Sequence, residues 1–367
     1  MQTLIIFLIV LSILVFVHEF GHFIVARIFG VKVEEFGFGF PPRMIGIKKK
    51  DTIYSINWIP LGGFVKLKGE EGDHAQDHDS FISKKVWQRG IIVAAGVIMN
   101  FVLAAIIFSA GLMYGLPHNL EGLPGSAQVR DASIVVGQVL KDSPAEKVGF
   151  EYGDKVVSID GKAFDKIEGI QEYVKTNSKN EMLWSVKRGN NSLDFSATPI
   201  LIEQTGTHGI GVGLVGVGIV SYPWYLASVK GVELTVFLAR DILFAFGHVI
   251  SGLVTQGHLT VELAGPVGIA VLTGEVVALG ILSLLQFIAV LSINLAIINF
   301  LPFPALDGGR FLFLIIEKFR GKPVGRRLEA IIHQIGFALL LLVVLIVTYR
   351  DLVKFSDAII GGFKNLF

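Results

Sequence analysis

The stretch Leu4–Phe29, LIIFLIVLSILVFVHEFGHFIVARIF, decides how the rest of the chain is interpreted. A helix needs about 20 mainly apolar residues to cross the hydrocarbon core of a bilayer, so this stretch is long enough to span a membrane. It nevertheless contains His18-Glu19-Phe20-Gly21-His22. A charged residue inside a span costs at least about 2.5 kcal/mol, so three polar residues this close together indicate a function.

The histidines of this stretch have the spacing of metal ligands. On a helix, residues i and i+4 lie on nearly the same face, so His18 and His22 can bind one zinc ion. Glu19 is rotated by about 100° around the helix axis and lies beside such a site, where it can accept a proton from water. The H-E-x-x-H pattern therefore predicts a zinc site with Glu19 as general base.

A catalytic zinc ion typically has three protein ligands, so a third ligand is expected at the same membrane depth. Asp307 fits, because it follows the third apolar segment in the run Leu306-Asp307-Gly308-Gly309. An Asp-Gly pair can also be an ordinary turn. Pro302 and Pro304 favour the ligand interpretation, because they end the preceding helix and bring Asn299 to the same place.

Composition agrees with a membrane protein. Only 17% of the 367 residues are charged, against about 25% in an ordinary soluble protein. The net charge of +1 makes nucleic-acid binding an unexpected function. The absence of cysteine excludes disulfides, thiolate zinc sites and cysteine catalysis.

Three further apolar segments are long enough to span a membrane: Gly90–Leu116, Val276–Leu301 and Ala330–Tyr349. A fifth segment, Trp224–Val254, carries charges that favour an amphipathic helix lying at the interface. The loops after the first and third spans are rich in Lys and Arg, so both are expected in the cytoplasm, with the long central region outside.

Two regions have the patterns of β-structure. The stretch 31–68 is β-like, because Tyr54, Ile56 and Trp58 alternate with Ser55 and Asn57. Its aromatic, glycine-rich run Gly37-Phe38-Gly39-Phe40 is typical of a loop held at a membrane. The stretch 126–200 reads as a small α+β domain, in which Met182–Lys187 is expected to pair with Leu193–Ser196. The glycines between 209 and 218 predict an irregular, closely packed connection.

These observations predict a polytopic α-helical membrane protein with about four transmembrane helices, a membrane-associated β-hairpin region and one extracytoplasmic α+β domain. The expected divisions are residues 1–116, with the first two spans and the hairpin loop (31–68), and residues 126–200, with the small domain. Residues 201–275 are expected to form a linker and the interfacial helix, and residues 276–367 the last two spans.

The two site motifs together carry a family resemblance. His18-Glu19-Phe20-Gly21-His22 and Asn299-Phe300-Leu301-Pro302-Phe303-Pro304-Ala305-Leu306-Asp307-Gly308-Gly309 resemble the site-2 protease family of intramembrane zinc metalloproteases, and in particular the bacterial regulator-of-sigma-E type. The resemblance implies zinc on His18, His22 and Asp307, Glu19 as general base, and Asn299 at the substrate carbonyl. The further residues expected at the substrate are Gly37, Phe38, Gly39, Asn294, Pro302 and Pro304.

The small domain resembles a PDZ domain through Ser143-Pro144-Ala145 and the run Gly153–Lys162, but no clear carboxylate-binding loop of the Gly-Leu-Gly-Phe type precedes Ile134. The chain contains one such domain, whereas some relatives have two.

The family resemblance implies regulated intramembrane proteolysis in a bacterial inner membrane. The expected partners are the lipid bilayer and single-pass membrane substrates, such as anti-sigma factors or remnant signal peptides, trimmed first by a site-1-type protease. A transporter or channel is a second possibility, because such proteins also place ionisable residues in their spans. An inactive membrane scaffold that presents a PDZ-like domain is a third.

Overall fold

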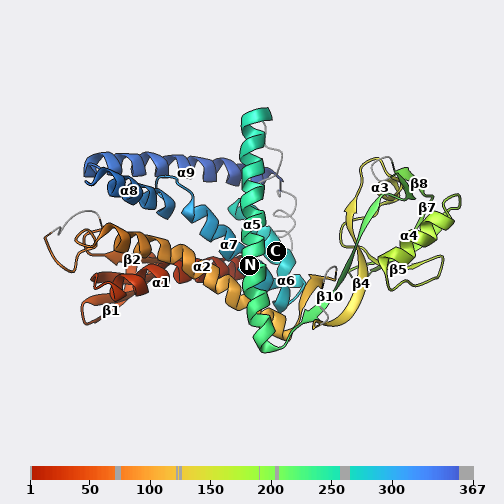
Figure 1. Cartoon of the computed structure of the whole chain (residues 1–367), viewed down its shortest axis with the longest axis horizontal. Helices are drawn as coiled ribbons and strands as arrows, with labels where there is room; N and C mark the ends of the chain where they lie inside the picture. The colour runs from red at the N-terminus through yellow and green to blue at the C-terminus, as the bar shows by residue number, and fades with distance from the viewer. Residues whose placement is uncertain are drawn as a thin grey trace, which may run out of the picture. The chain divides into compact units, whose positions relative to one another are not determined.

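The fold was obtained as a computed structural model, which describes residues 2–70, 76–120, 123, 126–189, 191–202, 206–256 and 265–354. The chain forms two compact units. The larger unit contains Met1–Ala110 and Ser228–Phe367, and the smaller, β-rich unit contains Gly111–Ala227. All the long apolar helices belong to the larger unit, apart from the last turn of α2 (Figure 1).

Four helices are long and apolar enough to cross a membrane: α1 (Gln2–Ile28), α2 (Val86–Tyr114), α7 (Ile281–Phe300) and α9 (Arg326–Lys354). They cover the four segments predicted from hydropathy. Each of these helices exposes large apolar side chains, as a surface in contact with lipid requires. Helix α5 (Trp224–Gln256) confirms the fifth predicted helix, and its place at the interface stays a prediction.

The third span is found, but it begins five residues later than the predicted Val276. The structure has a separate helix α6 (Pro266–Ala278), a break at Leu279 and Gly280, and then α7. Gly280 has φ of 104°, a conformation that glycine adopts readily and other residues rarely do. Hydropathy alone does not detect this break, because the residues on both sides of it are apolar.

Strands β1 (Val33–Lys49) and β2 (Thr52–Leu67) form the predicted β-region. Each strand doubles back on itself, so Gly37 pairs with Phe64 on one side and with Ser55 on the other. The resulting order across the sheet is 63–67, 33–38, 52–59 and 43–49. The segment 63–67 is therefore an edge of this sheet.

The β-rich unit has a six-stranded sheet in the order β3-β10-β4-β5-β6-β7, in which all described pairs are antiparallel. Its strands are β3 (Leu116–Asn119), β4 (Gln128–Val139), β5 (Lys155–Ile159), β6 (Met182–Arg188), β7 (Asn191–Ala197) and β10 (Val212–Ser221). The short helices α3 (Pro144–Val148) and α4 (Ile167–Thr176) and the small hairpin of β8 (Ile200–Ile202) and β9 (Thr207–Gly209) complete the unit. The core is built around Trp184, which is 1% exposed. The predicted pairing of Met182–Lys187 with Leu193–Ser196 is confirmed, since Trp184 faces Phe195.

The prediction of an irregular connection at residues 209–218 was wrong, because most of it lies in the central strand β10. The glycines there are separated by valine, leucine and isoleucine, of which the β-branched residues favour strands, and the ladder has an irregularity at Gly213 and Leu214. Gly218 packs closely against its neighbours: a Cβ atom there would lie 3.1 Å from the side chains of both Leu120 and Val129.

Candidate metal centre

The structure brings His18, His22 and Asp307 together in the larger unit. The two histidines lie one turn apart on α1 and are 5% and 8% exposed, and Asp307 is the first residue of α8 (Asp307–Arg320). Asp307 Oδ2 lies 2.9 Å from His18 Nε2 and 3.3 Å from His22 Nε2. The two histidine Nε2 atoms are 3.3 Å apart.

These separations fit a zinc ion. Ligand atoms at about 2.0–2.1 Å from a tetrahedral ion lie about 3.3 Å from one another, and the three measured edges are 2.9, 3.3 and 3.3 Å. Two neutral imidazoles and one carboxylate are also a donor set found in catalytic zinc sites.

Asp307 reaches the histidines because the chain turns sharply after α7. Helix α7 ends at Phe300, and Pro302 and Pro304 prevent it from continuing. Glycines then allow the turn to fold tightly: a Cβ atom on Gly308 would lie 2.1 Å from Leu301 O, and one on Gly309 would lie 2.4 Å from Phe303 O. The two glycines after Asp307 are therefore needed for backbone packing.

Helix α2 forms the wall behind the histidines. A Cβ atom on Gly96 would lie 2.4 Å from His22 Nε2 and 2.7 Å from the His18 ring, and one on Gly21 would lie 2.4 Å from Ala95 O. Sequence reasoning missed Gly96. The run Ala94-Ala95-Gly96 marks a stretch of small residues that permits close helix packing, but it does not identify the partner helix.

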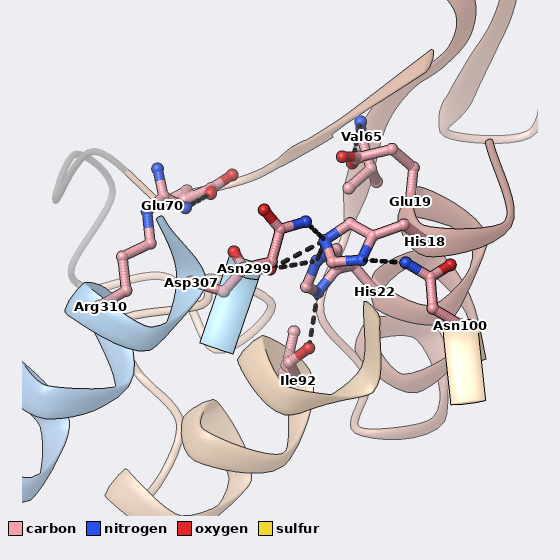
Figure 2. A network of polar contacts seen from close by, with 10 residues as sticks. All are labelled: His18, Glu19, His22, Val65, Glu70, Ile92, Asn100, Asn299, Asp307 and Arg310. Atoms are coloured by element: carbon pink, nitrogen blue, oxygen red, sulfur yellow. Dashed lines mark hydrogen bonds and ion pairs between the residues drawn. The ribbon is translucent and has the colours of Figure 1, made fainter. Parts of the chain in front are cut away.

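The same helix contacts the second ring nitrogen of each histidine (Figure 2). His22 Nδ1 lies 2.8 Å from the carbonyl oxygen of Ile92, and His18 Nδ1 lies 3.3 Å from Asn100 Nδ2. Asn100 is fully buried, and its Oδ1 has no hydrogen-bond partner within the described part of the chain. From the sequence, Asn100 is a polar residue of the second apolar segment, for which interhelical hydrogen bonding is the default interpretation and a place beside the substrate path is the alternative.

Glu19 and Asn299 also lie at the cluster. Glu19 Oε2 accepts a hydrogen bond of 3.1 Å from the backbone N–H of Val65, in the edge segment 63–67. Asn299 Nδ2 lies 3.5 Å from His18 Nε2, on the opposite side of the His18 ring from Asn100 (Figure 2). Further out, Arg310 forms an ion pair with Glu70.

The other predicted residues differ in how they relate to the cluster. Pro302 and Pro304 belong to the turn that presents Asp307, while Gly37 and Gly39 lie in the sheet that contacts Glu19. Phe38 is 38% exposed. Asn294 donates a hydrogen bond of 3.1 Å to Val290 O within its own helix, and its described contacts do not include the three ligands.

Comparison with known proteins gives a consistent result. The sequence profile of peptidase family M50 matches residues 6–343. The chain is 31% identical to the zinc metalloprotease RasP of Geobacillus kaustophilus, over 97% of this chain and 99% of that protein. It is 34% identical to a putative zinc metalloprotease of Clostridium perfringens, over 94% and 97% of the two chains. It is 32% identical to the regulator of sigma-W protease RasP of Bacillus subtilis, over 96% and 98%.

Among solved structures, a PDZ domain of an SdrC-like protein from Listeria monocytogenes matches with 27% identity and a TM-score of 0.22, over 24% of this chain and 92% of that one.

Proposed function

Since this chain belongs to peptidase family M50 and is a zinc metalloendopeptidase of the site-2 protease type, we propose that it cleaves the transmembrane segments of single-pass membrane proteins. One observation carries the proposal: His18 and His22 are buried on a helix that is apolar and long enough to span a membrane, and Asp307 from another helix completes the cluster.

Each residue of the cluster has a defined task. Zinc held by the two histidines and Asp307 would polarise the scissile carbonyl and lower the pKa of the attacking water. Glu19 takes the proton from that water and returns it to the leaving amine. Asn299 donates its amide N–H to the substrate carbonyl oxygen, where negative charge develops. Its 3.5 Å distance from His18 supports this task.

Helix α2 fixes how the histidines present their nitrogens. A histidine that binds metal through Nε2 carries its proton on Nδ1 and needs an acceptor there. Ile92 O is that acceptor for His22. For His18, Asn100 must face the ring with Oδ1, and a 180° turn of the amide achieves this, because amide orientation is assigned from the hydrogen-bond network. The turn also satisfies Oδ1, which otherwise has no partner among the described residues.

The edge segment 63–67 is suited to hold the substrate. A peptide bond inside a helix is shielded by its own hydrogen bonds, so the substrate has to be extended before cleavage, and an exposed sheet edge binds extended peptides. Val65 of this edge contacts Glu19, so a strand paired there is close to the general base. Gly37, Phe38 and Gly39 of the neighbouring strand are then part of the substrate surface, together with the Pro302–Pro304 turn and Asn294.

The test compares Glu19→Gln with Asp307→Ala in purified protein, using bound zinc and cleavage of a single-pass membrane substrate as readouts. Glu19→Gln should keep about one zinc ion per chain and lose cleavage, while Asp307→Ala should lose both. Cleavage by Glu19→Gln would disprove the role of the general base. Unchanged zinc binding by Asp307→Ala would remove Asp307 from the ligand set.

We also propose that the basic loops face the cytoplasm and that the β-rich unit is extracytoplasmic. The concentration of Lys and Arg in the loops after the first and third spans supports this orientation. Reporters fused after Lys50 and after Lys322 should score as cytoplasmic, and one fused at Asn190 should score as external. An external score after Lys50 would reverse the orientation.

The β-rich unit is proposed to exclude bulky substrates, so that only proteins already trimmed by an upstream site-1-type protease are cleaved. Anti-sigma factors are one candidate class, supported by the name of the sigma-W protease from Bacillus subtilis, and remnant signal peptides are another. Because the sheet includes β3 and β10, the test replaces residues 116–221 with a flexible linker. The variant should then cut untrimmed substrate. Failure of a zinc-loaded variant to cut trimmed substrate would instead indicate a recruiting role.

A further inference from the structure

A hollow of about 630 Å³ lies between the end of α1 and the turn that joins β1 to β2. Its lining residues are Arg27, Ile47, Lys49, Lys50 and Tyr54. A second hollow shares Arg27 but is lined also by Asp51 and Asp79, so its charge is mixed. Among the side chains that line the first hollow, three are cationic and none is acidic.

The three cations of this hollow differ from Lys66 and Arg43 of the adjoining sheet, which have carboxylate partners. Lys66 is paired with Glu34 and Arg43 is paired with Glu35. The ion pairs found between described residues do not include Arg27, Lys49 or Lys50. Three positive charges that face one hollow without a carboxylate partner favour an anionic ligand.

Arg27 is held in place. Its guanidinium lies 5.2 Å from the centre of the Phe23 ring, and Nη1 donates a hydrogen bond of 3.3 Å to the Tyr54 hydroxyl. Neither partner neutralises its charge. A fixed guanidinium retains several N–H donors in a planar arrangement that fits the oxygens of a phosphate group.

The hollow continues into an apolar strip on the same face of the sheet. Ile45 pairs with Ile56 and Ile47 pairs with Tyr54, and Lys49 follows two residues later on the same face. Ile45, Ile47 and Ile56 are 56%, 69% and 50% exposed. Lys48 points to the opposite face, because successive residues of a strand alternate.

We propose that this hollow binds the headgroup of an anionic phospholipid. Arg27, Lys49 and Lys50 contact the phosphate, and an acyl chain lies along the isoleucine strip. Arg27 belongs to the last turn of a helix of membrane-spanning length, which is the depth at which lipid headgroups are found. The apolar strip favours a phospholipid over a free phosphate ion, because a phosphate ion has no acyl chain to place on it.

The test uses the purified full-length protein and native mass spectrometry, titrated with phosphatidylglycerol or with phosphatidylcholine. The wild type should bind phosphatidylglycerol at least about tenfold more tightly. Each cation near a charged headgroup contributes about fivefold in affinity, so Lys49→Gln with Lys50→Gln should lose most of this preference. Lys48→Gln is the matched control for Lys49→Gln alone, since each removes one charge and the two side chains lie on opposite faces: Lys49→Gln should lose about fivefold in affinity and Lys48→Gln should bind like the wild type.

Three results would overturn the proposal. Equal affinity for the two lipids would show that charge is not recognised, and an equal loss in Lys48→Gln would show that the attraction is diffuse. Displacement of phosphatidylglycerol by inorganic phosphate at equal concentration would show that the ligand is a soluble anion. Unchanged zinc content and thermal unfolding of the variants confirm that they remain folded.

Discussion

Replacing Asn100 by leucine should weaken zinc binding without removing a ligand. Asn100 is the described partner of His18 Nδ1, and it is fully buried, so no water takes its place when the amide is lost. Leucine has nearly the same size and offers no acceptor. The His18 N–H is then left buried and unsatisfied whenever His18 binds the metal through Nε2.

The size of the effect follows from two independent estimates. A buried donor without a partner costs about 1–3 kcal/mol. Loss of a hydrogen-bond partner to a metal-binding histidine lowers metal affinity about 10–100-fold, which corresponds to about 1.4–2.7 kcal/mol. Asn100→Leu should therefore raise the Kd for zinc by one to two orders of magnitude. Asn100→Asp retains an acceptor and should restore most of the affinity.

The assay is competition for zinc against a chelator of known affinity, followed by metal analysis of the purified protein. Asn294→Leu is the matched control, because Asn294 is also an asparagine within a membrane helix but donates to its own backbone at Val290. Its zinc affinity should stay within about twofold of the wild type. If Asn100→Leu binds zinc as tightly as the wild type, or if Asn294→Leu is weakened equally, the orienting role of Asn100 is refuted.

Three further predictions follow from other parts of the structure. Gly96→Ala should lower zinc affinity at least about tenfold, because the added Cβ atom displaces α2 from the two histidines. Gly247→Ala should leave zinc affinity unchanged, because an added Cβ atom there has no neighbour within 4 Å. In the β-rich unit, burial opposes ionisation of Asp154, yet the hydrogen bonds from Arg188 keep the Asp154 pKa below the ordinary 3.8. The Asp154–Arg188 pair therefore stabilises the fold fully above pH 3.8, and this stabilisation is lost as the pH falls below that value through the Asp154 pKa of the folded protein. Arg188→Leu should cost about 3 kcal/mol of unfolding free energy near pH 7 and flatten this acid dependence in thermal unfolding. Removing zinc with a chelator should lower the unfolding free energy of the larger unit by about 2.7 kcal/mol, relative to protein at a free zinc concentration of 100 Kd. Chemical denaturation measures this difference, and an unchanged denaturation midpoint would contradict zinc binding to the folded protein.

Much of the metal centre could be predicted because its signals are local. Helix periodicity alone places His18 and His22 on one face, and membrane depth connects them with Asp307. The contribution of α2 could not be found in the same way. Gly96 and Asn100 contact the histidines although they lie about 80 residues further along the chain. A local sequence pattern does not specify which helix packs against the histidines.

The errors in the fold have a related cause. The break at Gly280 lies between two apolar helices, so hydropathy does not change across it. In β10, the number of glycines suggested a loop, although the valine and isoleucine residues between and after them favour a strand. At the α6–α7 break and in β10, the structure depends on backbone conformation and packing, which cannot be deduced from amino-acid composition alone.

The distance along the chain between His18 and Asp307, 289 residues, also sets when this enzyme can become active. Ribosomes add about 5–20 residues per second, so roughly 15–60 s separate the synthesis of the first ligand from that of the last. During that interval the growing chain already contains the proposed general base, Glu19, and both histidines but lacks the Asp307 carboxylate. A chain that has not yet reached Asp307, or that terminates before it, therefore has an incomplete set of the proposed ligands and is expected to be inactive.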